Sequence, residues 1–208
     1  MIYFIADLHL GHAGVIDLCH RPFSSVKEMD RILIENWNRK VKRNDTVYVI
    51  GDLIWDKRKV SFYLEQLSGK KILITGNHDT AWAQKAEVQP YFEEIVPYLE
   101  TNLNCHPVTL CHYPLLEWRS GRKPSQRKIG YHIHGHIHNR VSDLYRPLYL
   151  RFHALNAGAD INGFSPVTFP ELVENNLRFK LSVLRTQEEK DYLLESARAE
   201  TLPPCPFF

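Results

Sequence analysis

Histidine, aspartate and asparagine recur in five short stretches of the chain, and these are side chains that bind metal ions or transfer protons. The most conspicuous stretch is YHIHGHIHNR (131–140), which places four of the eleven histidines at alternate positions. The others are DLH (7–9), GD (51–52), GNHD (76–79) and HYP (112–114). Their donor atoms are oxygen and nitrogen without a thiolate, which suits Mn, Fe, Zn, Co or Ni better than a structural zinc or Cu(I) site.

The spacing within these stretches indicates that several side chains share one site. In an extended chain, residues two apart face the same side, so Asp7 and His9 can bind one ion. His136 and His138 can face one cluster for the same reason. The carboxylate of Asp52 has two oxygens and can bridge two ions roughly 3.5–4 Å apart, as in two-metal hydrolases. The sequence therefore predicts two divalent ions in a site that attracts phosphate.

Each stretch lies at the end of a short apolar run of the kind that forms a buried strand. The runs are IYFIA (2–6), TVYVI (46–50), KILIT (71–75), PVTLC (107–111) and YHIH (131–134). Near-continuous apolar runs of this length suit strands buried on both faces. Ligands of open α/β sheets bind beyond the carboxyl ends of the strands, so the runs would deliver their polar ends to one place. Gly51, Gly76 and Gly135 permit sharp turns and close backbone approach there.

Helical patterns between the early strands complete an α/β arrangement. Residues 25–41 carry apolar side chains at helical spacing, with Ser24 or Ser25 as the N-cap. Residues 58–67 predict a second helix, which ends before Gly69. Strands that alternate with helices favour parallel sheets with right-handed crossovers.

The second half of the chain is richer in strands. We expect them near residues 91–95, 98–104, 106–111, 131–135 and 148–155. The segment FPELVENNLRF (169–179) predicts a short helix, and residues 186–200 predict an amphipathic helix followed by a frayed tail.

Length and composition indicate a globular protein of one large domain. The net charge of +2 over 208 residues is too small to point to nucleic acid or to a membrane. Four cysteines without a C-x-x-C pair argue against a zinc finger and a disulfide scaffold. The N-terminal run lacks the basic region and cleavage site of a signal peptide, and no apolar run is long enough to span a membrane. The expected location is the cytoplasm.

The ordered series D-x-H, G-D, G-N-H-D, H and G-H-x-H resembles the calcineurin-like metallophosphoesterase superfamily, and more narrowly its small single-domain bacterial or phage members. The resemblance implies an α/β fold in four layers, an αββα sandwich. It assigns the metallophosphoesterase domain to 1–185 and a C-terminal helix and tail to 186–208, packed on that domain or fraying from it. It also implies two divalent transition-metal ions, with manganese favoured and iron, zinc, nickel or cobalt as alternatives.

The same resemblance distributes the candidate ligands between the two ions. One ion would take Asp7, His9 and His138, the other would take Asn77, His112 and His136, and Asp52 would bridge them. A bridging hydroxide would then attack phosphorus in line with the leaving oxygen.

Two residues of GNHD are the candidates for catalysis. His78 stands where the family places the residue that contacts phosphate and assists the leaving group, and Asp79 would orient it. The alternatives are a structural histidine in a tight turn and an aspartate that caps a helix starting near Ala81.

Three further residues are candidates for contact with the substrate. His12 would contact it near the first ion or cap the next helix, and Arg21 would bind phosphate or form a salt bridge. Arg122 belongs to the basic loop WRSGRKPSQRK (118–128), which is either a solvated loop or a lid that grips phosphate. In a lid, Trp118 would stack on a ring of the substrate.

The four alternating histidines do not share one role. Gly135 separates His136 and His138, the expected ligands, from His132 and His134 inside the apolar run. The latter two are expected to be core histidines or partners of ligands.

The leading functional hypothesis is hydrolysis of a small phosphomonoester or phosphodiester. A nuclease or nucleic-acid end-processing phosphatase is the alternative, which the basic loop and a pI near 8.3 allow. A lipid-precursor pyrophosphatase ranks lower, because no long apolar segment would grip acyl chains. A metal-free scaffold of this fold predicts broken ligand positions, and none is broken here. The oligomeric state stays open.

Overall fold

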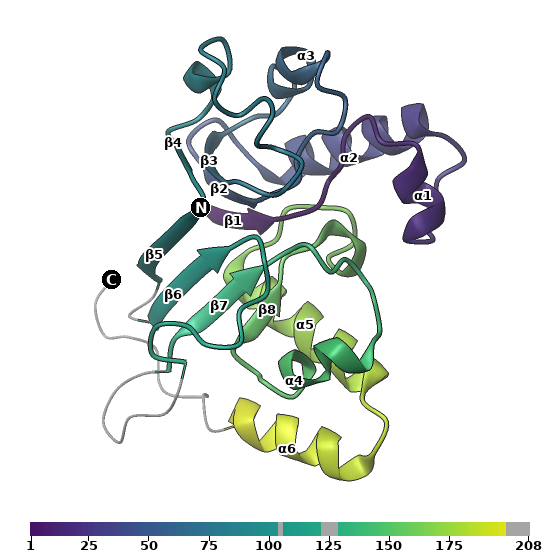
Figure 1. Cartoon of the computed structure of the whole chain (residues 1–208), viewed down its shortest axis with the longest axis vertical. Helices are drawn as coiled ribbons and strands as arrows, with labels where there is room; N and C mark the ends of the chain where they lie inside the picture. Colours follow the sequence, from purple (N-terminus) through teal and green to yellow (C-terminus); the bar gives the residue numbers. More distant parts are fainter. Residues whose placement is uncertain (104–105, 122–128, 199–208) are drawn as a thin grey trace.

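The computed structural model describes residues 1–103, 106–121 and 129–198, which form two four-stranded sheets packed face to face (Figure 1). The first sheet is parallel and has the order β1 (Ile2–Ile5), β2 (Thr46–Ile50), β3 (Lys70–Ile74) and β4 (Glu94–Val96). The second has the order β5 (Tyr98–Leu103), β6 (His106–Cys111), β7 (Tyr131–His134) and β8 (Ala154–Asn156). In that sheet, β5 is antiparallel to β6 and the other pairs are parallel.

Helices flank the outer sides of the two sheets, which gives the four layers of an αββα sandwich (Figure 1). Beside the first sheet are α1 (Gly14–Leu18), α2 (Val26–Lys40) and α3 (Val60–Leu64). Beside the second are α4 (Arg146–Tyr149), α5 (Phe169–Val183) and α6 (Gln187–Arg198). The 3-10 turns are η1 (Gln89–Tyr91), η2 (Asp143–Tyr145) and η3 (Ala159–Ile161). The predicted fold class is confirmed, and no helix within the described residues is long and apolar enough to cross a bilayer.

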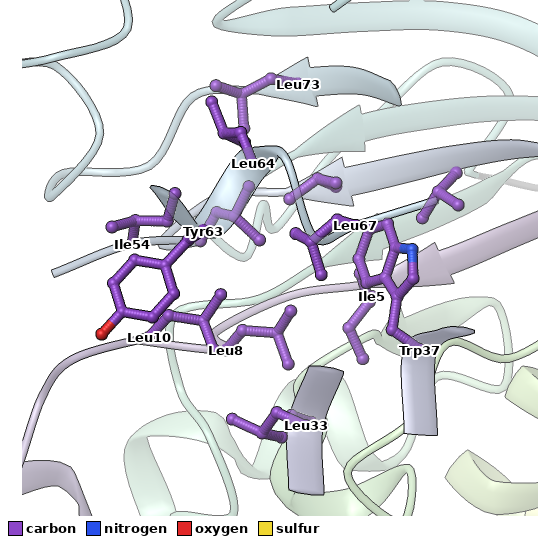
Figure 2. Packing of buried hydrophobic residues seen from close by; sticks show 14 of the residues in the cluster. Ile5, Leu8, Leu10, Leu33, Trp37, Ile54, Tyr63, Leu64, Leu67 and Leu73 are labelled. Atoms are coloured by element: carbon purple, nitrogen blue, oxygen red, sulfur yellow. The ribbon is translucent and has the colours of Figure 1, made fainter. Parts of the chain in front are cut away.

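Alternation along the strands of the parallel sheet divides the buried side chains between two cores. Along β1 and the residue after it, Tyr3 and Ile5 belong to the core shared with α2 and α3, whereas Phe4 and Ala6 belong to the core between the sheets. Figure 2 shows the first core, where Ile5 lies close to Trp37. Both faces of the strand are buried, which explains why the sequence reads as one continuous apolar run.

The predicted helix over 25–41 is present as α2, and its cap is Ser25. The Ser25 hydroxyl accepts the Glu28 backbone N–H at 3.2 Å, and this helix buries Met29, Leu33 and Trp37 at intervals of four residues. Of the two serines considered as the N-cap, Ser25 is therefore the residue that caps the helix.

The structure corrects two predicted strands, and proline explains both. The strand expected over 148–155 starts only at Ala154, because α4 begins just before Pro147 and occupies the start of that range. Proline is tolerated in the first turn of a helix, where its missing N–H would have had no partner. The strand expected over 91–95 is β4, which begins at Glu94 after a 3-10 turn that contains Pro90.

Two predicted helices differ in length from the observed ones, and a third is described only in part. The helix expected over 58–67 contracts to α3, and the short helix over 169–179 continues to Val183 as α5. The helix over 186–200 is α6, which is described as far as Arg198. Its Leu193 side chain is buried in the same core as Phe4 and Ala6. The expected tail lies outside the described residues.

Lys180 on α5 is buried and gives the fold a pH-dependent stability. Its ammonium nitrogen donates to the carbonyl oxygen of Arg151 at 2.7 Å and to that of Ala154. Burial lowers the pKa of the Lys180 ammonium group from 10.5 to about 7. Between these two values the unfolded chain binds one more proton at this residue than the folded chain does, so stability rises with pH.

We expect this residue to add roughly 1.5–2 kcal/mol to the free energy of unfolding between pH 7 and pH 8.5. Urea unfolding of the original chain and of Lys180→Met at both pH values measures the effect. Between the same two pH values, the free energy of unfolding of Lys180→Met should rise by that much less. An equal increase in the two proteins would show that the Lys180 pKa is not lowered by folding.

Candidate metal centre

The polar stretches that follow five strands meet at one edge of the two sheets. A cavity of about 150 Å³ opens there, and its walls include the side chains of His9, Asp52, Asn77, His78, His136 and His138. Asp7 and His112 lie behind it and are fully buried. The convergence follows from topology, because the carboxyl ends of neighbouring parallel strands meet at the same edge of a sheet.

The first group of possible ligands consists of Asp7, His9 and His138, whose donor atoms lie within 4.8 Å of one another. The His9 and His138 rings stack at a centroid distance of 5.0 Å. Within the described part of the chain, both ring nitrogens of His9 are buried without a hydrogen-bond partner. A buried polar atom without a partner is costly. An ion bound to one of these nitrogens would supply the missing partner, so these residues fit a divalent cation.

The second group surrounds the amide of Asn77. The Asn77 Oδ1 atom lies 3.1 Å from His112 Nε2 and 3.1 Å from His136 Nδ1. The Asp52 Oδ2 atom lies between the groups, 3.6 Å from His9 Nε2 and 3.5 Å from His112 Nε2. All seven candidate ligands named from the sequence are thus brought together. Asp7 also lies within 4.8 Å of the donor atoms of Asp52 and His112, so it is close to both groups rather than to one.

Hydrogen bonds outside the cluster orient two of the histidines. His112 Nδ1 lies 2.9 Å from the Ile50 carbonyl oxygen, and His138 Nδ1 lies 2.8 Å from the Asp160 carboxylate. Each contact is to an acceptor, so Nδ1 carries the proton and Nε2 is left for another partner. This arrangement is typical of histidines that bind metal ions.

Burial and neighbouring charge shift the ionisation of the cluster. Burial raises the pKa of Asp7 to about 6 and lowers that of His9 to about 2, so His9 is neutral at pH 7. Burial opposes the charged forms of Asp52 and His112, but their mutual contact outweighs it. The pKa of Asp52 falls to about 2, and that of His112 rises to about 9. An ion that binds His112 Nε2 would therefore displace a proton.

Five of the seven candidate ligands have a left-handed backbone. Their φ angles are 55° at Asp7, 53° at His9, 53° at Asp52, 70° at His136 and 52° at His138. Positive φ is uncommon outside glycine and costs on the order of 1–3 kcal/mol per residue. Such conformations persist where the surroundings impose them, and they concentrate at functional sites.

Two glycines let the backbone approach these ligands closely. Gly51 has a φ of +79°, and a Cβ atom there would lie 2.2 Å from His112 Nδ1. A Cβ atom at Gly135 would lie 2.7 Å from an Asp7 carboxylate oxygen. Of the three glycines named from the sequence, only Gly51 has a positive φ, and Gly76 and Gly135 are required for space.

Asp79 does not occupy the position expected of it. Its buried carboxylate accepts the backbone N–H groups of Asp52 at 2.7 Å, Leu53 at 3.1 Å and Gly76 at 2.9 Å. It thus ties the loop of Asp52 to the loop of His78, instead of orienting the His78 ring or capping a helix near Ala81 with its side chain.

Arg21 forms a salt bridge, which was one of the two roles considered for it. Its side chain is buried and pairs with Asp160 through Nε at 2.8 Å and a terminal nitrogen at 3.1 Å. The same terminal nitrogen donates to the Asp7 carbonyl oxygen at 2.7 Å. Contact with a substrate does not fit this position. Asp160 was not singled out from the sequence, although it follows β8 as the other polar residues follow their strands.

The remaining candidates are divided between the cavity, the core and the residues not described. His12 lines the cavity wall, with its ring stacked on Trp55. His132 and His134 are buried in β7, where His132 Nε2 accepts the Leu115 backbone N–H at 3.0 Å. Trp118 is also buried. Arg122 and most of the basic loop lie outside the described residues.

Two facing sheets with a cluster of oxygen and nitrogen donors at their strand ends define the calcineurin-like class of α/β sandwiches. The profile of the calcineurin-like phosphoesterase family matches residues 1–140, more than half of the chain. The chain belongs to this family.

The chain is also similar to other proteins over most of its length. Uncharacterized protein MJ1445 of Methanocaldococcus jannaschii is 34% identical over 188 residues, which cover 89% of this chain and 95% of that protein. The gene 66 protein of Mycobacterium phage D29 is 24% identical over 67% of this chain and 79% of its own length. The crystal structure of AQ665 from Aquifex aeolicus, a protein of unknown function, aligns with a TM-score of 0.64 and 26% identity. That alignment covers 84% of this chain and 98% of the other.

Proposed function

We propose that this protein is a metal-dependent phosphoesterase that hydrolyses a small phosphomonoester or phosphodiester. The observation that carries the proposal is the buried His9 ring, which lacks hydrogen-bond partners at both nitrogens and lies inside a cluster of oxygen and nitrogen donors. The donor set suits two divalent ions, with manganese favoured and iron, zinc, nickel or cobalt as alternatives. Such ions would polarise phosphoryl oxygens and make water a better nucleophile at neutral pH.

The chain's own residues would bind and separate the two ions. We assign one ion to Asp7, His9 and His138, the other to Asn77, His112 and His136, and Asp52 to both. Asp160 and the Ile50 carbonyl would hold two of the imidazoles with Nε2 toward the ions. Asp79 would hold the Asp52 loop in place through its backbone.

We assign to His78 the role of assisting the leaving group. Its Nε2 atom lies 3.9 Å from Asp52 Oδ2, and its side chain is 36% exposed at the cavity wall. The His78 backbone N–H donates to Asp52 Oδ1 at 2.9 Å, which fixes the residue beside the centre. A histidine with this access can donate a proton or a hydrogen bond to the oxygen that leaves phosphorus.

Replacing His78 by alanine should leave both ions bound and lower kcat by about 10²–10⁴-fold on alkyl esters, whose leaving oxygen needs a proton. On p-nitrophenyl esters the loss should be much smaller, because the leaving phenolate is stable without one. Metal content by elemental analysis and kcat on the two ester types measure the effect. His20→Ala, at an exposed histidine that is not in the wall of the cavity, is the control. Loss of an ion from the His78 variant would make His78 a ligand.

The proposal itself is tested by stripping the protein with a chelator and restoring one metal at a time. Bis-p-nitrophenyl phosphate, p-nitrophenyl phosphate, cyclic nucleotides and short oligonucleotides should be assayed with Mn, Ni, Zn and Mg. Turnover should disappear on stripping and return with a transition metal. Two bound ions without turnover of any ester would overturn the proposal in favour of a binding protein.

A further inference from the structure

A second cavity of about 500 Å³ adjoins the candidate metal centre. It is lined by Gly11, Trp55, Asp56, Lys57, Arg58 and His78. His78 is also in the wall of the smaller cavity at the cluster, so it stands between the two spaces. The volume lies within the range of pockets that hold small organic molecules. If His78 assists the leaving oxygen, the group attached to that oxygen projects past His78 into this second cavity.

The wall beside His78 is an exposed aromatic surface. Trp55 keeps 39% of its surface exposed, although it is a large apolar side chain. Its ring stacks on His12 with centroids 3.7 Å apart and an angle of 4° between the planes. The Trp55 and His78 centroids are 4.6 Å apart. A tryptophan held by such stacking is a preformed platform for a planar ring.

The rest of the lining carries an excess of positive charge. The Asp56 carboxylate contacts Arg58 Nε at 3.1 Å and Lys59 Nζ at 3.8 Å. Lys57 is exposed, and no hydrogen bond or ion pair within the described part of the chain involves its ammonium group. Within the lining, one acid thus stands beside one lysine and one arginine, and the resulting excess of positive charge favours an anionic group beside the aromatic platform.

We propose that this cavity binds the leaving group of the substrate and that this group is a nucleoside carrying a further phosphate. The inference rests on the proposed function, because it uses His78 to define the direction of the leaving group. The ring of a base would lie on Trp55, and the further phosphate would lie at Lys57. An acyl chain does not fit, because charged side chains form half of the lining. A plain sugar could stack on Trp55 but would leave the cations without a partner.

Matched substrates that differ only in the leaving group test this inference. Two comparisons test the base: adenosine monophosphate against ribose 5-phosphate, and a dinucleoside monophosphate against the analogue in which a methyl group replaces the leaving nucleoside. A third comparison tests the further phosphate: the dinucleoside monophosphate against its form phosphorylated on the leaving nucleoside. Stacking of one base contributes about 1–3 kcal/mol, so Trp55→Leu should lower kcat/KM roughly 5–150-fold on base-bearing leaving groups. It should change kcat/KM less than threefold on base-free analogues. Lys57→Ala should weaken only the substrate with the further phosphate. Tyr192→Leu, at an exposed aromatic of α6, is the control.

The outcomes separate this inference from the proposed function. Equal effects of Trp55→Leu on substrates with and without a base, while the original chain turns over phosphate esters, would overturn the inference alone. If Lys57→Ala changes kcat/KM equally on substrates with and without the further phosphate, that phosphate does not bind at Lys57. If no ester is turned over, the proposed function fails. Equilibrium dialysis of adenosine monophosphate then decides the inference, and a difference below threefold between the original chain and Trp55→Leu would overturn it.

Discussion

Replacing Asp52 by asparagine is expected to lower turnover about 10³-fold or more and to reduce the bound metal from two ions to one at most. Asp52 is buried, and its Oδ2 atom lies within 4 Å of ring nitrogens of His9, His78 and His112. Asparagine keeps the volume and the oxygen that accepts the His78 backbone N–H. It removes the negative charge and replaces one donor oxygen by an amide nitrogen, which cannot bind a cation.

Elemental analysis of the purified protein and kcat on p-nitrophenyl esters, measured on the same sample, test this expectation. Asp17→Asn is a matched control, because Asp17 is an exposed aspartate on α1 near the centre and has no part in the cluster. Circular dichroism and urea unfolding would establish that both variants fold. Full turnover with two bound ions in Asp52→Asn would remove Asp52 from the bridging position.

The second large effect is expected at Arg21, which links two candidate ligands of the first group, Asp7 and His138. Its guanidinium contacts Asp160, the acceptor for His138, and also the carbonyl oxygen of Asp7. The Arg21 and Asp160 side chains are 0% and 1% exposed. Removing one partner of a buried ion pair leaves an uncompensated charge and costs about 3–5 kcal/mol. Loss of the support for a metal-binding histidine should also weaken metal affinity about 10–100-fold.

Arg21→Met tests both effects, with urea unfolding in chelator for stability and competition with a chromophoric chelator for metal affinity. Arg178→Met is the control, since the Arg178 pair with Glu174 is about 70% exposed and should contribute little. A purely structural role is excluded by the double variant Arg21→Met with Asp160→Leu. It removes both charges of the Arg21–Asp160 pair, so much of the lost stability should recover. Metal affinity should stay low, because His138 Nδ1 has lost its acceptor. Recovery of both, or a metal affinity unchanged in Arg21→Met, would show that Arg21 does not position the ligands.

Much of the centre was predictable because ligands and strands are coupled in the sequence. Asp52 stands two residues after the buried run that ends at Ile50, so the predicted strand also predicted where this candidate ligand would lie. The same reasoning from strand ends did not identify Asp160. There the strand was expected over 148–155, whereas β8 spans Ala154–Asn156, and the carboxylate is four residues after its end, in the 3-10 turn η3.

The roles of Arg21 and Asp79 could not be predicted for a different reason. Arg21 meets Asp160 from 139 residues away in the chain, and Asp79 binds backbone N–H groups 26 and 27 residues away. The local sequence pattern around these residues indicates neither contact. A buried arginine and an exposed one have the same sequence signature, and only the tertiary structure distinguishes them.

The left-handed backbone at five candidate ligands shows where the requirements of folding and of binding differ in this chain. A sequence selected for stability alone would place glycine or asparagine at such φ angles, yet three of these positions are histidines, His9, His136 and His138. At these φ angles the three histidines cost folding free energy. If their rings bind the proposed ions, the candidate centre lowers the stability of the empty protein in favour of activity, and binding of the ions would offset that loss.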